Sequence, residues 1–173
     1  MLDLQTHPAA ATHGALSFIR TMYFPSSVVS VTSYVEEITS FIRRFRAADG
    51  REDEIEIALR EALSNAIVHG NHADPRARVV VACRGTAEGE LWITVRDQGA
   101  GFDYHAATSA TSPNGQSLQR GSGIYLMQLM MDRVWFDEGG SVVHMHKNAV
   151  LEKALISDFV ACDDPQIETG RHF

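Results

Sequence analysis

The sequence predicts an α+β fold, a two-layer sandwich in which about three helices cover one face of a mainly antiparallel mixed sheet. Two strand pairs separated by short glycine-containing turns favour hairpins over repeated strand–helix–strand units. Two successive stretches before the first hairpin carry apolar residues at steps of three and four, which is helical spacing. The predicted order is strand, two helices, two strands, loop, helix and two strands.

The first strand and the first helix are predicted at residues 15–24 and 28–47. The strand alternates imperfectly, and Pro25 separates it from the helix. Ser26 or Ser27 is expected to cap this helix by accepting a hydrogen bond from a free backbone N–H group. The apolar stripe of the helix contains Val31, Val35, Ile38, Ile42 and Phe45.

The second helix is predicted to span residues 52–70. Asp49 and Glu52 have the spacing of a capping box, and the acidic residues that follow suit the positive end of a helix dipole. Pro75 prevents the helix from continuing, because proline has no backbone N–H group. The expected buried stripe contains Ile55, Leu59, Ala62 and Ala66.

Two hairpins and a third helix complete the predicted elements. Residues 79–83 and 91–95 are two apolar, strand-like runs that flank a glycine-containing turn. A second pair, at residues 134–136 and 142–146, flanks two consecutive glycines. Between the hairpins, residues 123–132 are predicted to form the third helix.

The 173 residues suit one domain, which we expect at residues 15–158. A flexible N-terminus of residues 1–14 and a loose tail of residues 159–173 are expected to flank it. Residues 149–156 are predicted to add a strand or a short helix. Residues 98–122 read as a long loop, and loops of this length are usually functional or mobile.

The formal net charge of −7 at pH 7 does not suit direct nucleic-acid binding, which usually requires a basic face. No apolar run approaches the roughly 20 residues that span a bilayer, and the N-terminus does not resemble a secretion signal. We therefore expect a cytoplasmic protein without a membrane partner. Cys83 and Cys162 lack metal-site or redox spacing and are predicted to be unpaired thiols.

Glu61 and Asn65 form the first candidate motif, because residues four apart lie on one face of a helix. His69 is expected to extend the same polar stripe. A carboxylate can orient or deprotonate a hydroxyl group, and an amide oxygen suits Mg²⁺ as a ligand. On spacing alone, a solvated helix face is the alternative interpretation.

Asp97, Gly99 and Gly101 form the second motif, at the end of a predicted strand. Asp97 continues the core-facing side of that strand, so its carboxylate needs a hydrogen-bond donor. The amino group of adenine would serve, and the glycines would let a flat ring approach the backbone closely. An ordinary strand end followed by a glycine turn is the alternative.

Arg120, Gly121, Ser122 and Gly123 form the third motif, which opens into the third predicted helix. Free N–H groups at the start of a helix favour anions, so a triphosphate would fit there. The segment lacks the lysine of a Walker loop and the preceding strand of a dinucleotide fingerprint. A flexible linker before a helix is the alternative.

Taken in this order, the three motifs resemble the ATP-site boxes of the GHKL superfamily, which includes gyrase-type ATPases, Hsp90-like chaperones, histidine kinases and MutL-like repair proteins. The resemblance covers residues 15–147. Residues 61–71 and 120–132 look most like the bacterial serine/threonine kinases that act as anti-sigma factors. The resemblance implies a Bergerat-type fold and a protein kinase that uses ATP and Mg²⁺.

The resemblance also implies a role for each residue of the first two motifs. Asp97 would hold the adenine amino group, and Gly99 and Gly101 would shape the adenine pocket. Asn65 would coordinate Mg²⁺. Glu61 would be the general base that activates a serine hydroxyl group on a partner protein.

For the third motif, the resemblance implies contact with phosphate. Gly121 and Gly123 would lie at the phosphates, and Ser122 belongs to the same binding segment. Arg120 is expected to neutralise phosphate charge, on the basis of its position only. Residues 104–120 would act as a lid over the nucleotide.

The implied biological cycle is partner switching. The protein would hold a sigma factor away from RNA polymerase, and an antagonist of the STAS type would compete for it. Phosphorylation of a serine on that antagonist would weaken its complex with an acidic kinase. A homodimer is expected. The alternative is a nucleotide-binding module that sequesters a partner without transferring phosphate.

His144 and His146 offer a separate idea, because they lie two residues apart on one face of a predicted strand. Such a pair could bind a metal ion. A surface face of a hairpin strand is the favoured interpretation.

Overall fold

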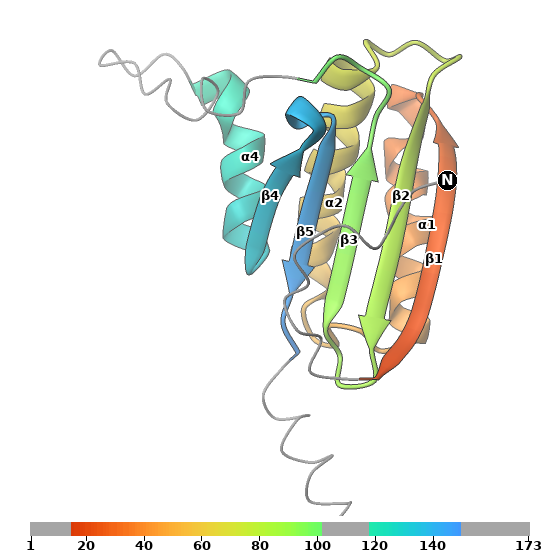
Figure 1. The fold of residues 1–173 in the computed structure, drawn as a ribbon, viewed down its shortest axis with the longest axis vertical. Helices are drawn as coiled ribbons and strands as arrows, with labels where there is room; N and C mark the ends of the chain where they lie inside the picture. Colours follow the sequence, from red (N-terminus) through yellow and green to blue (C-terminus); the bar gives the residue numbers. More distant parts are fainter. Residues whose placement is uncertain (1–14, 102–117, 150–173) are drawn as a thin grey trace, which may run out of the picture.

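The computed structural model describes residues 15–101 and 118–149, and Figure 1 shows its fold. Its strands and helices, in chain order, are β1 (Leu16–Pro25), η1 (Val28–Ser30), α1 (Val31–Arg44), α2 (Glu52–Ser64), η2 (Asn65–Gly70), β2 (Arg78–Thr86), β3 (Leu91–Arg96), α4 (Leu118–Met130), β4 (Arg133–Asp137), η3 (Glu138–Gly140) and β5 (Val142–Lys147). Both η1 and η3 are 3₁₀ turns, whereas η2 is a π-helical turn.

Five strands form one sheet in the order β1-β2-β3-β5-β4, and the three α-helices cover one of its faces (Figure 1). Every neighbouring pair of strands is antiparallel. The predicted α+β fold is therefore confirmed, with both hairpins. Within the described residues the sheet is antiparallel throughout rather than mixed.

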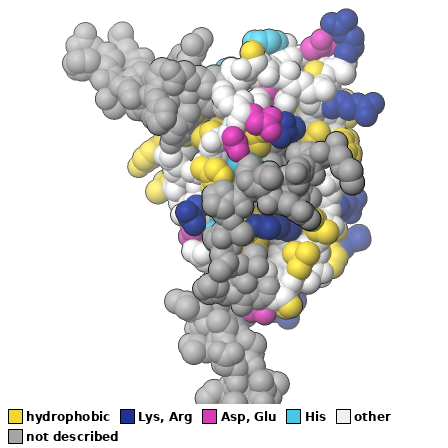
Figure 2. Space-filling model, viewed as in Figure 1, with side chains coloured by type: hydrophobic (Ala, Val, Ile, Leu, Met, Phe, Trp, Pro, Cys, Tyr) yellow, Lys and Arg dark blue, Asp and Glu magenta, His cyan; other side chains and the backbone are white. Residues whose placement is uncertain are grey.

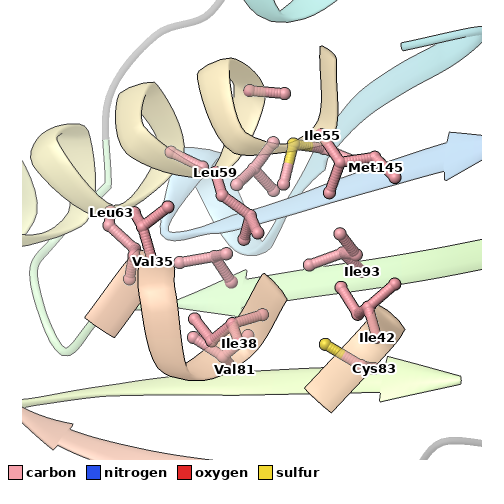
Figure 3. Packing of buried hydrophobic residues seen from close by; sticks show 14 of the residues in the cluster. Val35, Ile38, Ile42, Ile55, Leu59, Leu63, Val81, Cys83, Ile93 and Met145 are labelled. Atoms are coloured by element: carbon pink, nitrogen blue, oxygen red, sulfur yellow. The ribbon is translucent and has the colours of Figure 1, made fainter. Parts of the chain in front are cut away.

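The core lies between the helices and the sheet (Figure 3). Val35 and Ile38 on α1, together with Leu59 on α2, are fully buried. They pack in one cluster with Val81 and Ile93 from the sheet. Burial of each such side chain stabilises the fold by about 1.5–3 kcal/mol. The helical spacing in the sequence thus identified the faces that meet the sheet.

Phe45 lies at the edge of that core, whereas Cys83 lies inside it. Phe45 was predicted to end the apolar stripe of the first helix, but it lies just past the end of α1 and is 39% exposed, with its ring against Phe18. Cys83 lies inside, on β2, and burial raises the pKa of its thiol to about 12. It is a free cysteine, as expected. Cys162 lies outside the described residues.

Neither predicted helix cap is made. Ser27 precedes η1 without a capping hydrogen bond from its side chain, and its hydroxyl group lies 3.0 Å from that of Ser30. The capping box before α2 is also wrong, because α2 begins after Arg51 rather than after Asp49. The Nε of Arg46 donates to the Asp49 carboxylate. The N-cap of α2 is Arg51, whose side chain makes no capping bond. The hydroxyl group of Ser26 is buried without a hydrogen-bond partner among the described residues, so Ser26 caps no helix either.

The third helix, α4, begins at Leu118, five residues before its predicted start. The sequence places two glycines in this stretch, and each glycine weakens a helix by about 1 kcal/mol relative to alanine. Further along α4, however, Ile124 and Met127 are buried against the core, and this packing overrides the low propensity. Gly121 and Gly123 are consequently inside the helix rather than before it.

His144 and His146 also depart from expectation, because each is only 5% exposed. The His144 ring stacks on Trp135, and the His146 ring stacks on Trp92. His144 Nδ1 lies 2.9 Å from the hydroxyl oxygen of Thr94. The strand face that was expected to be at the surface is therefore buried, and each histidine lies beside a tryptophan of a neighbouring strand.

On the sheet side of the molecule, described side chains of both charge signs lie beside apolar ones (Figure 2). Within the described residues, no helix is long and apolar enough to cross a bilayer. The predictions for residues 1–14, 149–156 and 159–173 fall almost entirely outside the described part of the chain, as does most of the loop at residues 98–122.

Candidate functional site

The first and third motifs meet where α4 crosses α2. A Cβ atom at Gly123 would lie 2.6 Å from Oε2 of Glu61 and 3.6 Å from Nδ2 of Asn65. The absence of a side chain at Gly123 therefore lets the backbone of α4 approach both polar groups. Residues about 60 positions apart in the sequence form one surface at this crossing.

At Asn65, the second helix changes from α-helical to π-helical geometry. The backbone N–H of Asn71 donates to the carbonyl oxygen of Ala66, five residues earlier, at 2.8 Å. A π-turn has more residues per turn than an α-helix and is frequently found at functional sites. His69, expected to continue the stripe of Glu61 and Asn65, lies in this wider turn and is exposed.

The second motif meets the far end of the same π-turn. A Cβ atom at Gly70 would lie 2.2 Å from Cγ of Asp97, and one at Gly99 would lie 2.2 Å from the carbonyl oxygen of Gly70. Both approaches require glycine, because any side chain would overlap these atoms. Gly70 was not predicted as a site residue, although a glycine at the end of a helical pattern is a recognisable signal.

Asp97 is partly buried, and its carboxylate accepts one described hydrogen bond, from the Gly99 N–H to Oδ1 at 2.8 Å. Burial raises the pKa of its carboxyl group, while the Gly99 bond and the charge of Arg96 act in the opposite direction. A carboxylate in this setting gains from a further donor, and an exocyclic amino group is one.

Gly101 lies against the tip of the second hairpin. Its φ angle is +77°, and a Cβ atom there would lie 2.1 Å from the carbonyl oxygen of Gly139. The guanidinium group of Arg96 pairs through two hydrogen bonds with the carboxylate of Glu138 in the same tip. Neither Glu138 nor Gly139 was predicted to lie near the motif, because sequence spacing does not reveal contact between separate hairpins.

The third motif departs from the predicted geometry. Only the first four N–H groups of a helix lack partners inside it, and because α4 begins at Leu118 the last of them belongs to Arg120. Gly121 and Gly123 both come after it, so neither offers a free N–H group, and Gly123 instead offers close approach of the backbone. Arg120 and Ser122 lie in the same helix, and their side chains are outside the described part of the structure.

The side-chain oxygens of Glu61 and Asn65 suit a hard cation such as Mg²⁺ whose remaining ligands come from phosphate and water. In the described residues, no group of three or more His, Cys, Asp or Glu side chains could hold a metal ion. Mg²⁺ typically takes one or two protein oxygens and completes its shell with phosphates and water. The amide of Asn65 beside the open backbone of Gly123 suits that mode.

Comparison with known proteins decides the family. A family model described as "Histidine kinase-like ATPase domain" matches residues 24–147, which contain all three motifs. The chain belongs to this family. The resemblance to the GHKL superfamily seen in the sequence is thereby confirmed.

Relatives of this histidine kinase-like ATPase domain carry two kinds of name. An anti-sigma F factor of Heyndrickxia coagulans is 34% identical over 100 residues, which cover 55% of this chain and 68% of that protein. An anti-sigma F factor of Oceanobacillus iheyensis is 30% identical over 123 residues, which cover 68% of this chain and 84% of that protein. The serine-protein kinase RsbW of Bacillus licheniformis is 37% identical over 98 residues, which cover 52% of this chain and 61% of that protein.

A solved structure supports the fold of this ATPase domain. The RsbU and RsbW domains of Rv1364c from Mycobacterium tuberculosis match with a TM-score of 0.53 at 15% identity. The match covers 76% of this chain and 32% of that one. At this identity the likeness concerns the arrangement of helices and strands alone.

Proposed function

We propose that this histidine kinase-like ATPase domain binds Mg-ATP along α2 and η2 and transfers the γ-phosphoryl group to a serine or threonine hydroxyl group of a partner protein. One observation carries the proposal: Glu61 and Asn65 face α4 near one end of a helical segment, and Gly70 faces Asp97 at the other. The nine residue steps from Glu61 to Gly70 span about 14 Å at a rise of roughly 1.5 Å each, the length scale of a nucleoside triphosphate.

Each motif has a separate task in this proposal. Asp97 accepts a hydrogen bond from the adenine amino group, in a pocket shaped by Gly99 and Gly101. Asn65 holds Mg²⁺, which when bound would neutralise phosphate charge. Glu61 orients and deprotonates the attacking hydroxyl group.

Phosphate contact is proposed for the start of α4. Gly121 and the open backbone at Gly123 lie at the phosphates, supported by Ser122 and Arg120. A helix start attracts anions through its free N–H groups and its dipole. The lid expected at residues 104–120 lies outside the described residues except for its last three, which belong to α4.

The relatives' names, anti-sigma F factor and serine-protein kinase, support a partner-switching role. In this role the domain acts as a homodimer that sequesters a sigma factor until a STAS-type antagonist competes for it. Phosphorylation adds about −1.5 to −2 charge to the antagonist. Repulsion from a chain with a formal net charge of −7 then weakens their complex.

Two substitutions test the division of tasks. Glu61→Ala should abolish phosphate transfer to the antagonist while calorimetry still detects ATP binding. Asp97→Asn should instead weaken ATP binding itself. Asp53→Ala, exposed on the same helix as Glu61, is the matched control and should retain both activities.

The competing function is sequestration without transfer. It predicts that the native protein binds ATP and its partner, yet produces no phosphorylated antagonist in the presence of Mg²⁺. A native protein without measurable ATP affinity would refute both functions.

A further inference from the structure

The side chain of Asn71, directly after the π-turn, both accepts and donates a hydrogen bond, although the sequence analysis predicted no role for it. It is 6% exposed. Its Oδ1 accepts from the backbone N–H of Gln98 at 2.8 Å, and its Nδ2 donates to the carbonyl oxygen of Arg78 at 3.1 Å. Each half of the amide therefore has a partner on a different strand end.

A third bond closes the ring. The backbone N–H of Arg78 donates to Oε1 of Gln98 at 2.8 Å. Three chain segments are thus joined: the end of η2 through Asn71, the start of β2 through Arg78, and the turn after β3 through Gln98. The amide of Asn71 is the member that reaches both of the others.

This ring lies beside the candidate base-binding carboxylate. Gln98 directly follows Asp97, whose own backbone N–H donates to the carbonyl oxygen of Ser141 at 3.0 Å. Gly70 directly precedes Asn71 and has its Cα against the Asp97 carboxylate. The bond from Gln98 to Asn71 consequently fixes the separation between the π-turn and the turn that carries Asp97.

We propose that Asn71 is a positioning residue that sets the base selectivity of the site without touching the nucleotide. Its amide holds the Asp97 turn against Gly70, so that the carboxylate meets the 6-amino group of a purine. This inference rests on the proposed function, in which Asp97 accepts that amino group. Loss of the Asn71 amide frees the turn, and the aligned hydrogen bond to the base is lost.

The test compares two nucleotides that differ only at position 6 of the purine. Calorimetric dissociation constants are measured for Mg-ATP and for the Mg complex of purine riboside 5′-triphosphate, which lacks the amino group. In Asn71→Leu, we expect the ATP affinity to fall about ten- to a hundred-fold, by analogy with other misplaced site groups. The affinity for the second nucleotide should change less than about two-fold, because it makes no bond to Asp97.

Three further proteins guard against a trivial effect on folding. Gln98→Met removes only the outer bond of the ring and should show a smaller loss of the same selectivity, even if Asn71→Leu does not fold. Asn148→Leu, exposed at the end of β5, should behave as the native protein does. In an Asp97→Asn background, Asn71→Leu should produce no further change in the ratio of the two affinities.

The outcomes separate this inference from the function beneath it. Equal losses for both nucleotides in Asn71→Leu and Gln98→Met would show a merely structural role and overturn it. Retained discrimination in both variants would overturn it as well. A native protein that binds the two nucleotides equally would instead remove the assignment of Asp97, and this inference with it.

Discussion

Gly123→Ala should separate stability from activity in a single substitution. The position lies inside α4, where alanine is favoured over glycine by about 1 kcal/mol. The added methyl group would lie 2.6 Å from Oε2 of Glu61, which is the mobile end of a flexible side chain. The fold can therefore accept the substitution, whereas the carboxylate cannot stay in place.

The size of both effects follows from the contact. Ordinary contact begins at 3.4 Å, so the carboxylate oxygen must move by 3.4 − 2.6 Å, or about 0.8 Å. A misplacement near 1 Å can lower a reaction rate on the order of a hundred-fold. The helix gain raises the melting temperature by up to roughly 2–4 °C for a chain of this size. We expect transfer to fall about a hundred-fold in a protein at least as stable as the native one.

Thermal denaturation and initial rates of phosphate transfer from Mg-ATP measure the two quantities. Leu129→Ala, exposed on the same helix, is the control and should leave the rate unchanged. Transfer within three-fold of the native rate would refute the placement of Glu61 at the reacting centre. A melting temperature lowered by more than about 5 °C would refute the claim that the contact between α2 and α4 accepts the added methyl group without loss of stability.

Three other predictions concern separate parts of the structure. Gly70→Ala forces the Asp97 carboxylate to move, because the new Cβ would lie 2.2 Å from Cγ, and calorimetry should show an ATP affinity lower by on the order of a hundred-fold. Lys147→Met leaves Glu54 and the Met130 carbonyl without the buried ammonium group, and denaturant unfolding should show a loss of about 1–3 kcal/mol. The Cys83 thiol has a folded pKa of about 12 and an unfolded pKa of 9.0. Its contribution to the free energy of unfolding is therefore complete below pH 9 and declines as pH rises towards 12, and Cys83→Ala should remove that decline from denaturant unfolding.

The periodic parts of the fold could be predicted from the sequence. Apolar residues at helical spacing located Val35 and Ile38 against the sheet, and glycine turns located both hairpins. The sequence could not place the start of α4 at Leu118, because contacts with α2 outweigh the low helix propensity of glycine. It also could not show that both faces of β5 are covered, which His144 and His146 reveal.

The candidate site divides in the same way. Residue type and order identified Glu61, Asn65 and Asp97, and the structure brings each of them to one helical segment. Gly70 and Asn71 were missed because their importance lies in contacts across the fold. The π-turn that places them has no period of its own in the sequence, since tertiary bonds such as that from Asn71 to Gln98 accompany it.

The most direct test is a crystal structure of the complex with Mg²⁺ and a non-hydrolysable ATP analogue. We predict that the adenine amino group lies about 2.7–3.2 Å from an Asp97 oxygen and that the metal lies about 2.0–2.1 Å from the amide oxygen of Asn65. A nucleotide bound elsewhere, or one with its base away from Asp97 and its phosphates away from α4, would contradict the proposal that the three motifs form a single ATP site.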